Sequence, residues 1–527
     1  MKNVATSTAM PSVKTACAPP EGRGRPVRRL RVSAAAAILL AVPLVAGCAP
    51  TAAPAQGAGL ERFQDQSLQW AACEDAQLAG TGAECAMVTV PLDYSVPEGR
   101  TISVAISRIA STDPSQRRGI LLTNPGGPGG RGLGMPADVR SGMTEGVAKA
   151  YDVIGMDTRG LGESTPIDCG VPQMTWMRSA GADREGFDES VVRAKEAADA
   201  CWEKYPDILP HINTQNVARD LDVIRAVLGE PRTSFLGQSY GTFLGATYSQ
   251  MFPDRIDRLV LDSAPDPKKY GITMFQDMGP ANEKAIDDFS EWAASRSSEY
   301  GLGTTGVEVR KGIEKLISDA ALSPIPVGNY RLDDHILPFL MYASAVSDSE
   351  EDNEVFAQVL VQLRELADGR NVELHPKLAG LARAWFHTEL GTGSDFSATL
   401  AVVCGDVTLP SDPEWYWNQI QEHRLDQPIF APVHNTITPC SFWRAAPTAP
   451  VAIDNATPSL QIQAVGDTRT TYEEGLGMHA AMKGSRLVTI PGRIHAVFPS
   501  YGNECANRVV NEYLLEGTLP DKDMTCK

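Results

Sequence analysis

The order of apolar and polar residues predicts a chain in which short strands alternate with amphipathic helices. Short apolar runs that break into turns rich in glycine or proline are typical of buried strands. Such runs occupy residues 87–94, 102–109, 119–123, 151–156, 233–236 and 256–261. Within 214–228 the apolar residues recur at three- and four-residue spacing and Gly229 follows, which predicts an amphipathic helix. This alternation indicates βαβ units and an α/β fold with a mostly parallel sheet.

The pattern of apolar and polar residues changes at about residue 266. Helical patterns dominate up to residue 458 and are clearest at 281–295 and 355–366. Strand patterns then return at 459–465 and 486–490. The C-terminal stretch is too short to complete a second sheet, so we expect a single core with a helical cap insertion. The core would comprise 60–265 and 459–527, and the cap 266–458. Two domains in tandem are the alternative.

The first 47 residues are predicted to be a signal peptide. A basic stretch precedes an apolar run from Val32 to Val45, which is shorter than the roughly 20 residues that span a bilayer. Small residues then lead to Cys48, as in bacterial lipoproteins in which this thiol is acylated, and residues 48–59 form a tether. We therefore expect an extracellular, cell-surface lipoprotein that touches the membrane only through its lipid anchor. A plain secreted protein is the alternative.

Charge and cysteine content restrict the classes of partner and the cellular compartment that we expect. The 527 residues carry a formal net charge of −18, which repels phosphate backbones and disfavours nucleic-acid binding. Eight cysteines follow Cys48, and an even number in an exported chain indicates disulfides. The cysteine and histidine spacings do not match a zinc site, so no metal is expected. The simplest of the many possible pairings joins sequence neighbours: Cys73–Cys85, Cys169–Cys201, Cys404–Cys440 and Cys505–Cys526.

The pentapeptide Gly237-Gln238-Ser239-Tyr240-Gly241 carries the strongest chemical signal. It follows a predicted strand and precedes a segment, 242–250, that can be helical. This is the G-x-S-x-G pattern in the strand–turn–helix context of a nucleophile elbow, where the flanking glycines permit a tight turn that exposes the serine hydroxyl. We predict that Ser239 is a catalytic nucleophile rather than an ordinary turn serine.

A serine nucleophile needs a base, and the base needs a carboxylate that fixes its tautomer. His495 is the best base because it lies in a loop just after a late predicted strand. The expected acid is Asp467, which follows the strand pattern 459–465, and its rival is Asp262 at the end of 256–261. The order serine, acid, histidine is that of the α/β hydrolases. Poorer candidate bases lie before the nucleophile or in helical patterns: His211, His387, His423 and His479.

Acyl transfer also requires donors aimed at the developing oxyanion. The backbone N–H of Tyr240, directly after the nucleophile, is one expected donor. The loop Asn124-Pro-Gly-Gly-Pro-Gly129 follows an earlier predicted strand, and its glycines allow close approach to a substrate. We expect the second donor to be Gly127, with Gly126 as the alternative.

Four segments between Cys73 and Cys526 are specific in combination, although none is so alone. Together they resemble the exported actinobacterial tripeptidyl aminopeptidases, which are α/β-hydrolase serine peptidases related to proline iminopeptidases and carry a TAP-like C-terminal domain. The segments are Asn124-Pro-Gly-Gly-Pro-Gly129, Asp157-Thr-Arg-Gly-Leu-Gly-Glu-Ser164, Gly237-Gln-Ser-Tyr-Gly-Thr242 and Gly466-Asp-Thr-Arg-Thr-Thr-Tyr472.

The resemblance implies a triad of Ser239, Asp467 and His495, a helical cap over the cleft and the release of tripeptides from free N-termini. No cofactor is implied. This chain departs from the family at Thr468 and Thr471, where prolines are usual, and beside His495, where Ile and Ala replace glycines. These departures leave open an esterase or amide hydrolase that acts on a non-peptide substrate. A surface lipoprotein that binds a ligand without activity is a further alternative.

An aminopeptidase must also recognise an ammonium group, most simply with carboxylates of the cap. The start of the predicted insertion offers four, although an ordinary solvated helix face explains any one of them better: Asp277, Glu283, Asp287 and Asp288.

Overall fold

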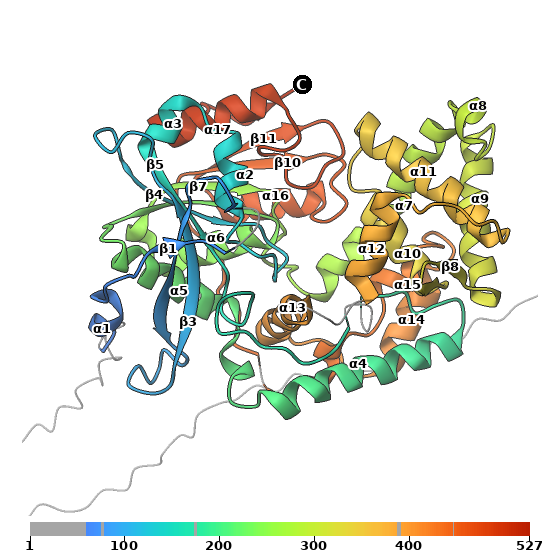
Figure 1. Cartoon of the computed structure of the whole chain (residues 1–527), viewed down its shortest axis with the longest axis horizontal. Coiled ribbons are helices and arrows are strands. Elements are labelled where there is room, and N and C mark those ends of the chain that lie inside the picture. The colour runs from blue at the N-terminus through green and yellow to red at the C-terminus, as the bar shows by residue number, and fades with distance from the viewer. Residues whose placement is uncertain (1–58, 75–77, 173–176, 387–391, 446) are drawn as a thin grey trace, which may run out of the picture. The chain divides into compact units, whose positions relative to one another are not determined.

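The computed structural model describes residues 59–74, 78–172, 177–386, 392–445 and 447–527. The predicted leader, Cys48, nearly all of the tether and His387 lie outside the described residues. Within them, a ten-stranded sheet has the strand order β1-β2-β3-β5-β4-β6-β7-β10-β11-β12 (Figure 1). The pairs from β5 through β12 are parallel, and those from β1 through β5 are antiparallel. This is the mostly parallel α/β sheet that the sequence predicts.

The strands follow the predicted apolar runs closely. Register places Asp262, the last residue of β7, beside Ile462 of β10, so the strands on either side of the predicted insertion are neighbours in one sheet. The strand bounds are β1 Ala71–Ala72, β2 Glu84–Pro91, β3 Thr101–Ile109, β4 Gly119–Asn124, β5 Tyr151–Met156, β6 Thr233–Gln238, β7 Ile256–Asp262, β10 Ser459–Ala464, β11 Ser485–Ile490 and β12 Met524–Thr525.

Helices cover both faces of the sheet. On one face a buried apolar cluster joins the strands to α2 (Met135–Ser141), α3 (Glu145–Ala150) and α17 (Glu504–Glu516). On the other, a larger cluster joins them to α5 (Thr214–Val227), α6 (Tyr240–Met251) and α16 (Tyr472–Ala481). Shorter helical pieces are α1 (Glu61–Gln64), η3 (Leu209–His211) and η4 (Pro253–Arg255).

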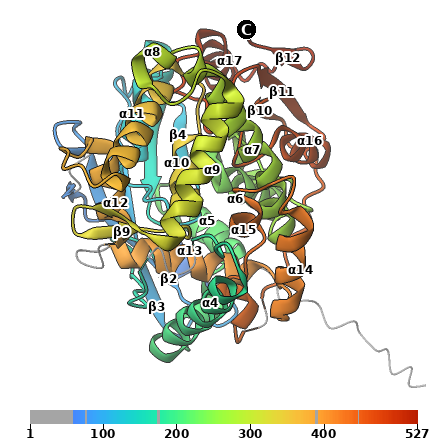
Figure 2. The ribbon, with the colours of Figure 1, turned by 90° about the vertical axis from the view of Figure 1, so that its right-hand side faces the viewer.

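The segment between β7 and β10 is largely helical and has an apolar core of its own. Figure 2 faces this group, with α9, α10 and α11 toward the viewer. A small antiparallel pair, β8 (Ile325–Val327) and β9 (Tyr330–Leu332), belongs to it. The helices are α7 (Ile272–Ala294), α8 (Ser297–Tyr300), α9 (Gly306–Leu322), α10 (Leu337–Ser344), α11 (Glu350–Ala367), α12 (Pro376–Phe386), α13 (Thr392–Asp406), α14 (Pro413–His423), α15 (Ala431–His434) and η5 (Pro439–Phe442).

One helix of this group comes from the segment assigned to the core in the sequence. Helix α4 (Arg184–Lys204) runs beside α14 in Figure 1, and Phe187 packs with Tyr416 and Ile420 in one buried cluster. Arg184 also forms an ion pair with Glu414 at 2.5 Å. Helix α4 therefore packs with the helices of the 266–458 segment, because Phe187 and Ala194 lie against α14, while Cys201 near its C-terminal end joins the buried cluster on the sheet.

Four disulfides tie loops and helices together: Cys73–Cys85, Cys169–Cys201, Cys404–Cys440 and Cys505–Cys526. These are the pairs of sequence neighbours. Cys404–Cys440 joins α13 to η5, two elements of the helical group that border the cavity described below. Among the helices of the described residues, none is long and apolar enough to cross a membrane.

Candidate active site

Ser239 lies in a sharp turn between strand β6 and helix α6. Its backbone has φ 55° and ψ −127°, a conformation that side-chain-bearing residues adopt only where the surroundings enforce it. The flanking glycines are required by close contacts: a Cβ on Gly237 would lie 2.2 Å from the Gly241 carbonyl oxygen, and one on Gly241 2.5 Å from that of Asn124. The turn therefore has the strand–turn–helix geometry of a nucleophile elbow, in which Ser239 precedes the first residue of α6.

Asp467 and His495 lie in loops that follow β10 and β11. Nδ1 of His495 is 2.9 Å from one carboxylate oxygen of Asp467 and 3.0 Å from the other. The Asp467 side chain is fully buried, and its Oδ1 accepts the backbone N–H groups of Arg469 and Thr470. These donors fix the carboxylate, so that it can hold the proton of His495 on Nδ1 and leave Nε2 as the acceptor.

Asp262, the rival acid, makes a different set of contacts. Its carboxylate accepts the backbone N–H groups of Val497 and Phe498 at 3.0 and 2.8 Å, in the loop that carries His495. Burial raises the pKa of Asp262 to about 6, although these two donors act to lower it. No hydrogen bond joins Asp262 to the His495 ring in the part of the chain that the structure describes. Asp262 therefore holds the histidine loop, whereas Asp467 contacts the imidazole.

The glycine loop after β4 lies against the elbow. A Cβ on Gly126 would be 2.8 Å from the Ser239 Cβ, and the Gly126 N–H donates to Oδ1 of Asn124 at 3.0 Å. Gly127 lines the cavity beside Ser239 and Tyr240, and its N–H has no hydrogen-bond partner among the described residues. Because the Gly126 N–H is already engaged, the geometry favours Gly127 and Tyr240 as the oxyanion donors.

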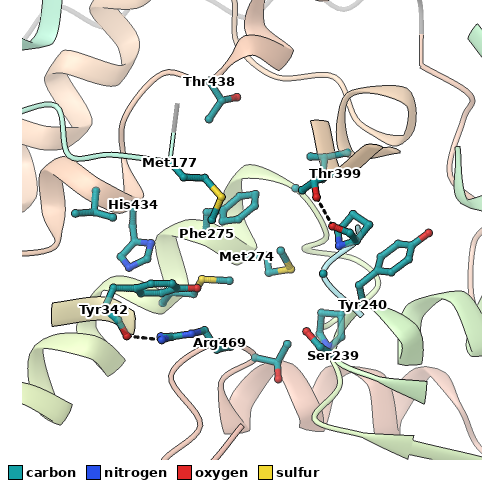
Figure 3. Close-up of a pocket in the computed structure, with 18 of the residues that line it drawn as sticks. Met177, Ser239, Tyr240, Met274, Phe275, Tyr342, Thr399, His434, Thr438 and Arg469 are labelled. Atoms are coloured by element: carbon teal, nitrogen blue, oxygen red, sulfur yellow. Dashed lines mark hydrogen bonds between the residues drawn. The ribbon is translucent and has the colours of Figure 1, made fainter. Parts of the chain in front are cut away.

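A cavity of about 370 Å³ brings these groups together, and both Ser239 and His495 line it. The His495 ring contacts Asp467 and Thr470 through Nδ1, while its Nε2 makes no hydrogen bond within the described part of the chain. Catalytic hydrogen bonds of this kind are often long before substrate binds. Figure 3 shows Ser239 and Tyr240 on one side of the cavity, with Met274 and Phe275 nearer its centre.

The wall of the cavity is mainly apolar and comes mostly from the helical group. Arg469 is the charged residue nearest to the acid in sequence; its guanidinium lies 3.3 Å from the centre of the Tyr342 ring and donates to the Tyr342 carbonyl oxygen. Burial lowers the pKa of Arg469. The apolar lining includes Met177, Met274, Phe275, Met278, Phe339, Val403 and Val433. Among the described residues, no carboxylate lines this cavity.

The four carboxylates suggested for ammonium recognition are engaged elsewhere. Asp277 forms an ion pair with Lys269 at 2.6 Å, and Asp288 one with Lys284 at 2.7 Å. Glu283 and Asp287 both contact Arg310, and Glu283 also accepts two backbone N–H groups. None of the four lines the cavity. The described residues also contain no group of histidine, cysteine and acidic side chains placed to hold a metal ion.

Comparison with known proteins identifies the family of this chain. Residues 119–298 match the model for the α/β hydrolase fold, and residues 427–526 match the model for TAP-like proteins. The chain is 35% identical over 500 residues to the tripeptidyl aminopeptidase of Streptomyces lividans, which covers 91% of this chain and 89% of that protein. The chain belongs to the tripeptidyl aminopeptidase family of α/β hydrolases. It is a serine hydrolase of the peptidase type.

Two more distant relatives carry different names. The chain is 27% identical over 488 residues to the serine protease Hip1 of Mycobacterium tuberculosis, a match that covers 88% of this chain and 91% of that protein. It is also 28% identical over 526 residues to the carboxylesterase B of the same species, over 92% and 95% of the two chains. Neither family model covers residues 299–426, which form much of the helical group.

The sequence does not single out three residues that the structure places at or beside the site. Thr470 contacts both Asp467 and His495, and Arg469 lines the cavity. Their position just after Asp467 was the available signal. Asp406 is buried and accepts the N–H and the hydroxyl of Thr214; the same hydroxyl contacts the Tyr240 phenol at 2.7 Å. No local pattern indicates this link between α13 and α5.

Proposed function

We propose that this chain is an exported aminopeptidase that releases tripeptides from free N-termini with Ser239, His495 and Asp467. The observation that carries this proposal is the 35% sequence identity to the tripeptidyl aminopeptidase of Streptomyces lividans, which extends over about nine-tenths of both chains. The contact between Asp467 and His495, and the cavity that His495 shares with Ser239, support the residue roles.

The roles that we assign are those of a triad of serine, histidine and aspartate. His495 takes the Ser239 proton on Nε2 as the Ser239 oxygen attacks the scissile carbonyl, and Asp467 stabilises the imidazolium through Nδ1. The carbonyl oxygen becomes an oxyanion that the N–H groups of Gly127 and Tyr240 bind. Collapse of this intermediate breaks the amide bond, and His495 returns the proton to the leaving amine. Water, activated by the same imidazole, then hydrolyses the acyl-enzyme ester and frees Ser239.

The proposal includes export by a signal peptide and attachment of a lipid anchor at Cys48. It rests on the sequence around Cys48 alone, because this segment lies outside the described residues. Expression of the full chain in an actinobacterial host, followed by fractionation, tests it. Cys48→Ser should move the protein from the membrane fraction to the soluble fraction, and unchanged membrane retention would contradict acylation.

One substrate panel separates the candidate activities. It comprises a tripeptidyl 4-nitroanilide with a free N-terminus, its N-acetylated form and short-chain 4-nitrophenyl esters. Turnover of the free-amine peptide alone supports the aminopeptidase. Turnover of esters alone supports an esterase, which the mainly apolar wall and the carboxylesterase B relative favour as the second candidate.

The nucleophile is tested in the same panel. Ser239→Ala should lower every activity by about 10⁴-fold or more, because the remaining groups act only on a nucleophile that is no longer present. Activity that survives Ser239→Ala unchanged would refute the assignment of this serine.

A further inference from the structure

Four buried polar atoms without a hydrogen-bond partner in the described residues belong to side chains that line the catalytic cavity. Buried polar groups are nearly always paired, so a cluster of exceptions in one cavity calls for an explanation. A bound molecule that supplies the missing partners is the simplest one. The atoms are Nε of Arg178, Nε2 of His434 and the hydroxyl oxygens of Thr436 and Thr438.

Arg178 is the charged member of this cluster. Only 8% of its surface is exposed, and its guanidinium makes no hydrogen bond or ion pair within the described part of the chain. Asp333, Asp334 and Glu189 act on it through space but do not form ion pairs with it, and burial lowers its pKa. A buried guanidinium without an anionic partner is costly to the fold. Buried groups of this kind cluster at functional sites, where a ligand can supply the missing partner.

The cluster lies away from the nucleophile, among elements of the helical group. Figure 3 shows Thr438 and Met177 at the end of the cavity opposite Ser239, and His434 along the wall beside Tyr342. Arg178 follows Met177 directly in the chain. A substrate whose carbonyl carbon reaches Ser239 would therefore extend a different part of itself toward Arg178 and Thr438.

The chemistry of this end of the cavity fits an anion. Arg178 and Arg469 are the charged residues of the described lining, and burial lowers the pKa of His434 to about 3, so that its imidazole is neutral. An ammonium group would meet these cations without a carboxylate in the described wall. A planar carboxylate, in contrast, suits both the guanidinium fork and hydroxyl donors.

We propose that this end of the cavity is a subsite for a carboxylate of the substrate, bound by the Arg178 guanidinium and by the hydroxyls of Thr436 and Thr438. The proposal rests on the proposed peptidase function, because it assigns part of the substrate of the same site. The carboxylate has two possible sources: an acidic side chain within the released tripeptide, or the C-terminal α-carboxylate of a short peptide.

Two arms of one kinetic experiment with the full chain distinguish these sources. The first compares three tripeptidyl 4-nitroanilides, each with one Glu among two Ala residues, with the same peptides carrying Gln. The second compares tetra-alanine as the free acid with its C-terminal amide. A charge-assisted hydrogen bond in a buried site predicts about a 10- to 100-fold higher kcat/KM for the carboxylate form in one arm.

Variants assign the preference to Arg178. Arg178→Gln should abolish the preference, so that kcat/KM for the carboxylate form falls to that for the neutral form in the same variant, and Arg178→Lys should retain part of the preference. The matched control is Arg370→Gln, because Arg370 is exposed and pairs with Glu365 and Asp368 away from the cavity; it should leave the preference intact. If Arg178→Gln does not fold, Thr438→Val provides the test and should reduce the preference several-fold.

The outcomes also separate this proposal from the proposed function. Equal rates for carboxylate and neutral forms in both arms, or a preference that survives Arg178→Gln, would overturn the subsite. If no peptide is cleaved but esters are, the peptidase proposal fails. In that case the subsite is tested by comparing the turnover of 4-nitrophenyl hydrogen glutarate with that of 4-nitrophenyl valerate. The subsite proposal requires that the glutarate ester is turned over faster and that Arg178→Gln removes this difference.

Discussion

Two buried aspartates end or follow neighbouring strands near the same histidine loop, and exchanging each for asparagine should separate their roles. In Asp467, Oδ1 accepts two backbone N–H groups and lies 3.0 Å from Nδ1 of His495, while Oδ2 lies 2.9 Å from the same nitrogen. An asparagine keeps the backbone contacts only if its amide nitrogen takes the place of Oδ2. That nitrogen would donate to Nδ1, so the proton of the imidazole would lie on Nε2. A protonated Nε2 cannot accept the proton of Ser239. A wrong tautomer of this kind lowers kcat by about 10⁴-fold.

Asp262→Asn should act through the loop instead. Each carboxylate oxygen of Asp262 accepts one backbone N–H, from Val497 or Phe498, so an asparagine leaves one of these donors facing an amide N–H. A buried donor without an acceptor costs about 1–3 kcal/mol of stability. We expect a lower melting temperature, and a loss in kcat of about tenfold, because the loop that carries His495 shifts.

The assay is kcat on the best substrate of the panel, together with thermal unfolding of both variants. The two aspartates are separated if Asp467→Asn is the slower enzyme by two or more orders of magnitude. A loss of activity in Asp262→Asn equal to that in Asp467→Asn, with unchanged stability, would refute the reasoning and make Asp262 the acid.

Three further predictions concern the surroundings of the site. Burial raises the pKa of Asp406 from 3.8 to about 7, so folding favours its protonated form, and this contribution is lost as pH rises from about 4 to 7. The melting temperature of Asp406→Asn relative to wild type should therefore rise over that range and then level off; a constant difference would contradict the sign. The double variant Cys404→Ser and Cys440→Ser should lose about 2–5 kcal/mol of stability in denaturant unfolding. Gly126→Ala places a Cβ 2.5 Å from the Gln238 carbonyl oxygen and should lower kcat about tenfold or more, whereas an unchanged kcat would show that the loop can move away.

The sequence predicts those parts of the fold whose stability is local. Strand β5 has the predicted bounds, and β7 and β10 differ by one residue at one end, because continuous apolar runs bounded by turns are buried on both faces. Helix α7 starts nine residues before the predicted 281, ahead of Pro280. The helical pattern is clearest only from residue 281 onward, whereas the observed helix includes Pro280, because tertiary packing carries α7 through the proline.

The Ser239 turn could be predicted because its cause is local: two glycines relieve close contacts across one tight turn. The sequence favours Asp467 over Asp262 by its place along the chain, but both aspartates adjoin the same end of one sheet. Only the three-dimensional path of the 495–498 loop decides which carboxylate meets the imidazole and which meets backbone N–H groups.

The far end of the cavity shows the limit of sequence reasoning most clearly. Arg178 lies between β5 and α4, in a stretch that the pattern assigned to the sheet core, whereas Thr436 and Thr438 lie more than two hundred residues later, near η5. They come together because α4 packs on α14 and because Cys404–Cys440 ties η5 to α13. No periodicity or motif encodes such a meeting, since each residue taken alone is an ordinary polar side chain. These side chains differ from ordinary polar residues only because burial removes the water that would otherwise hydrogen-bond to them. For this reason the inference about the substrate rests on the buried polar atoms without partners in this wall and not on a sequence motif.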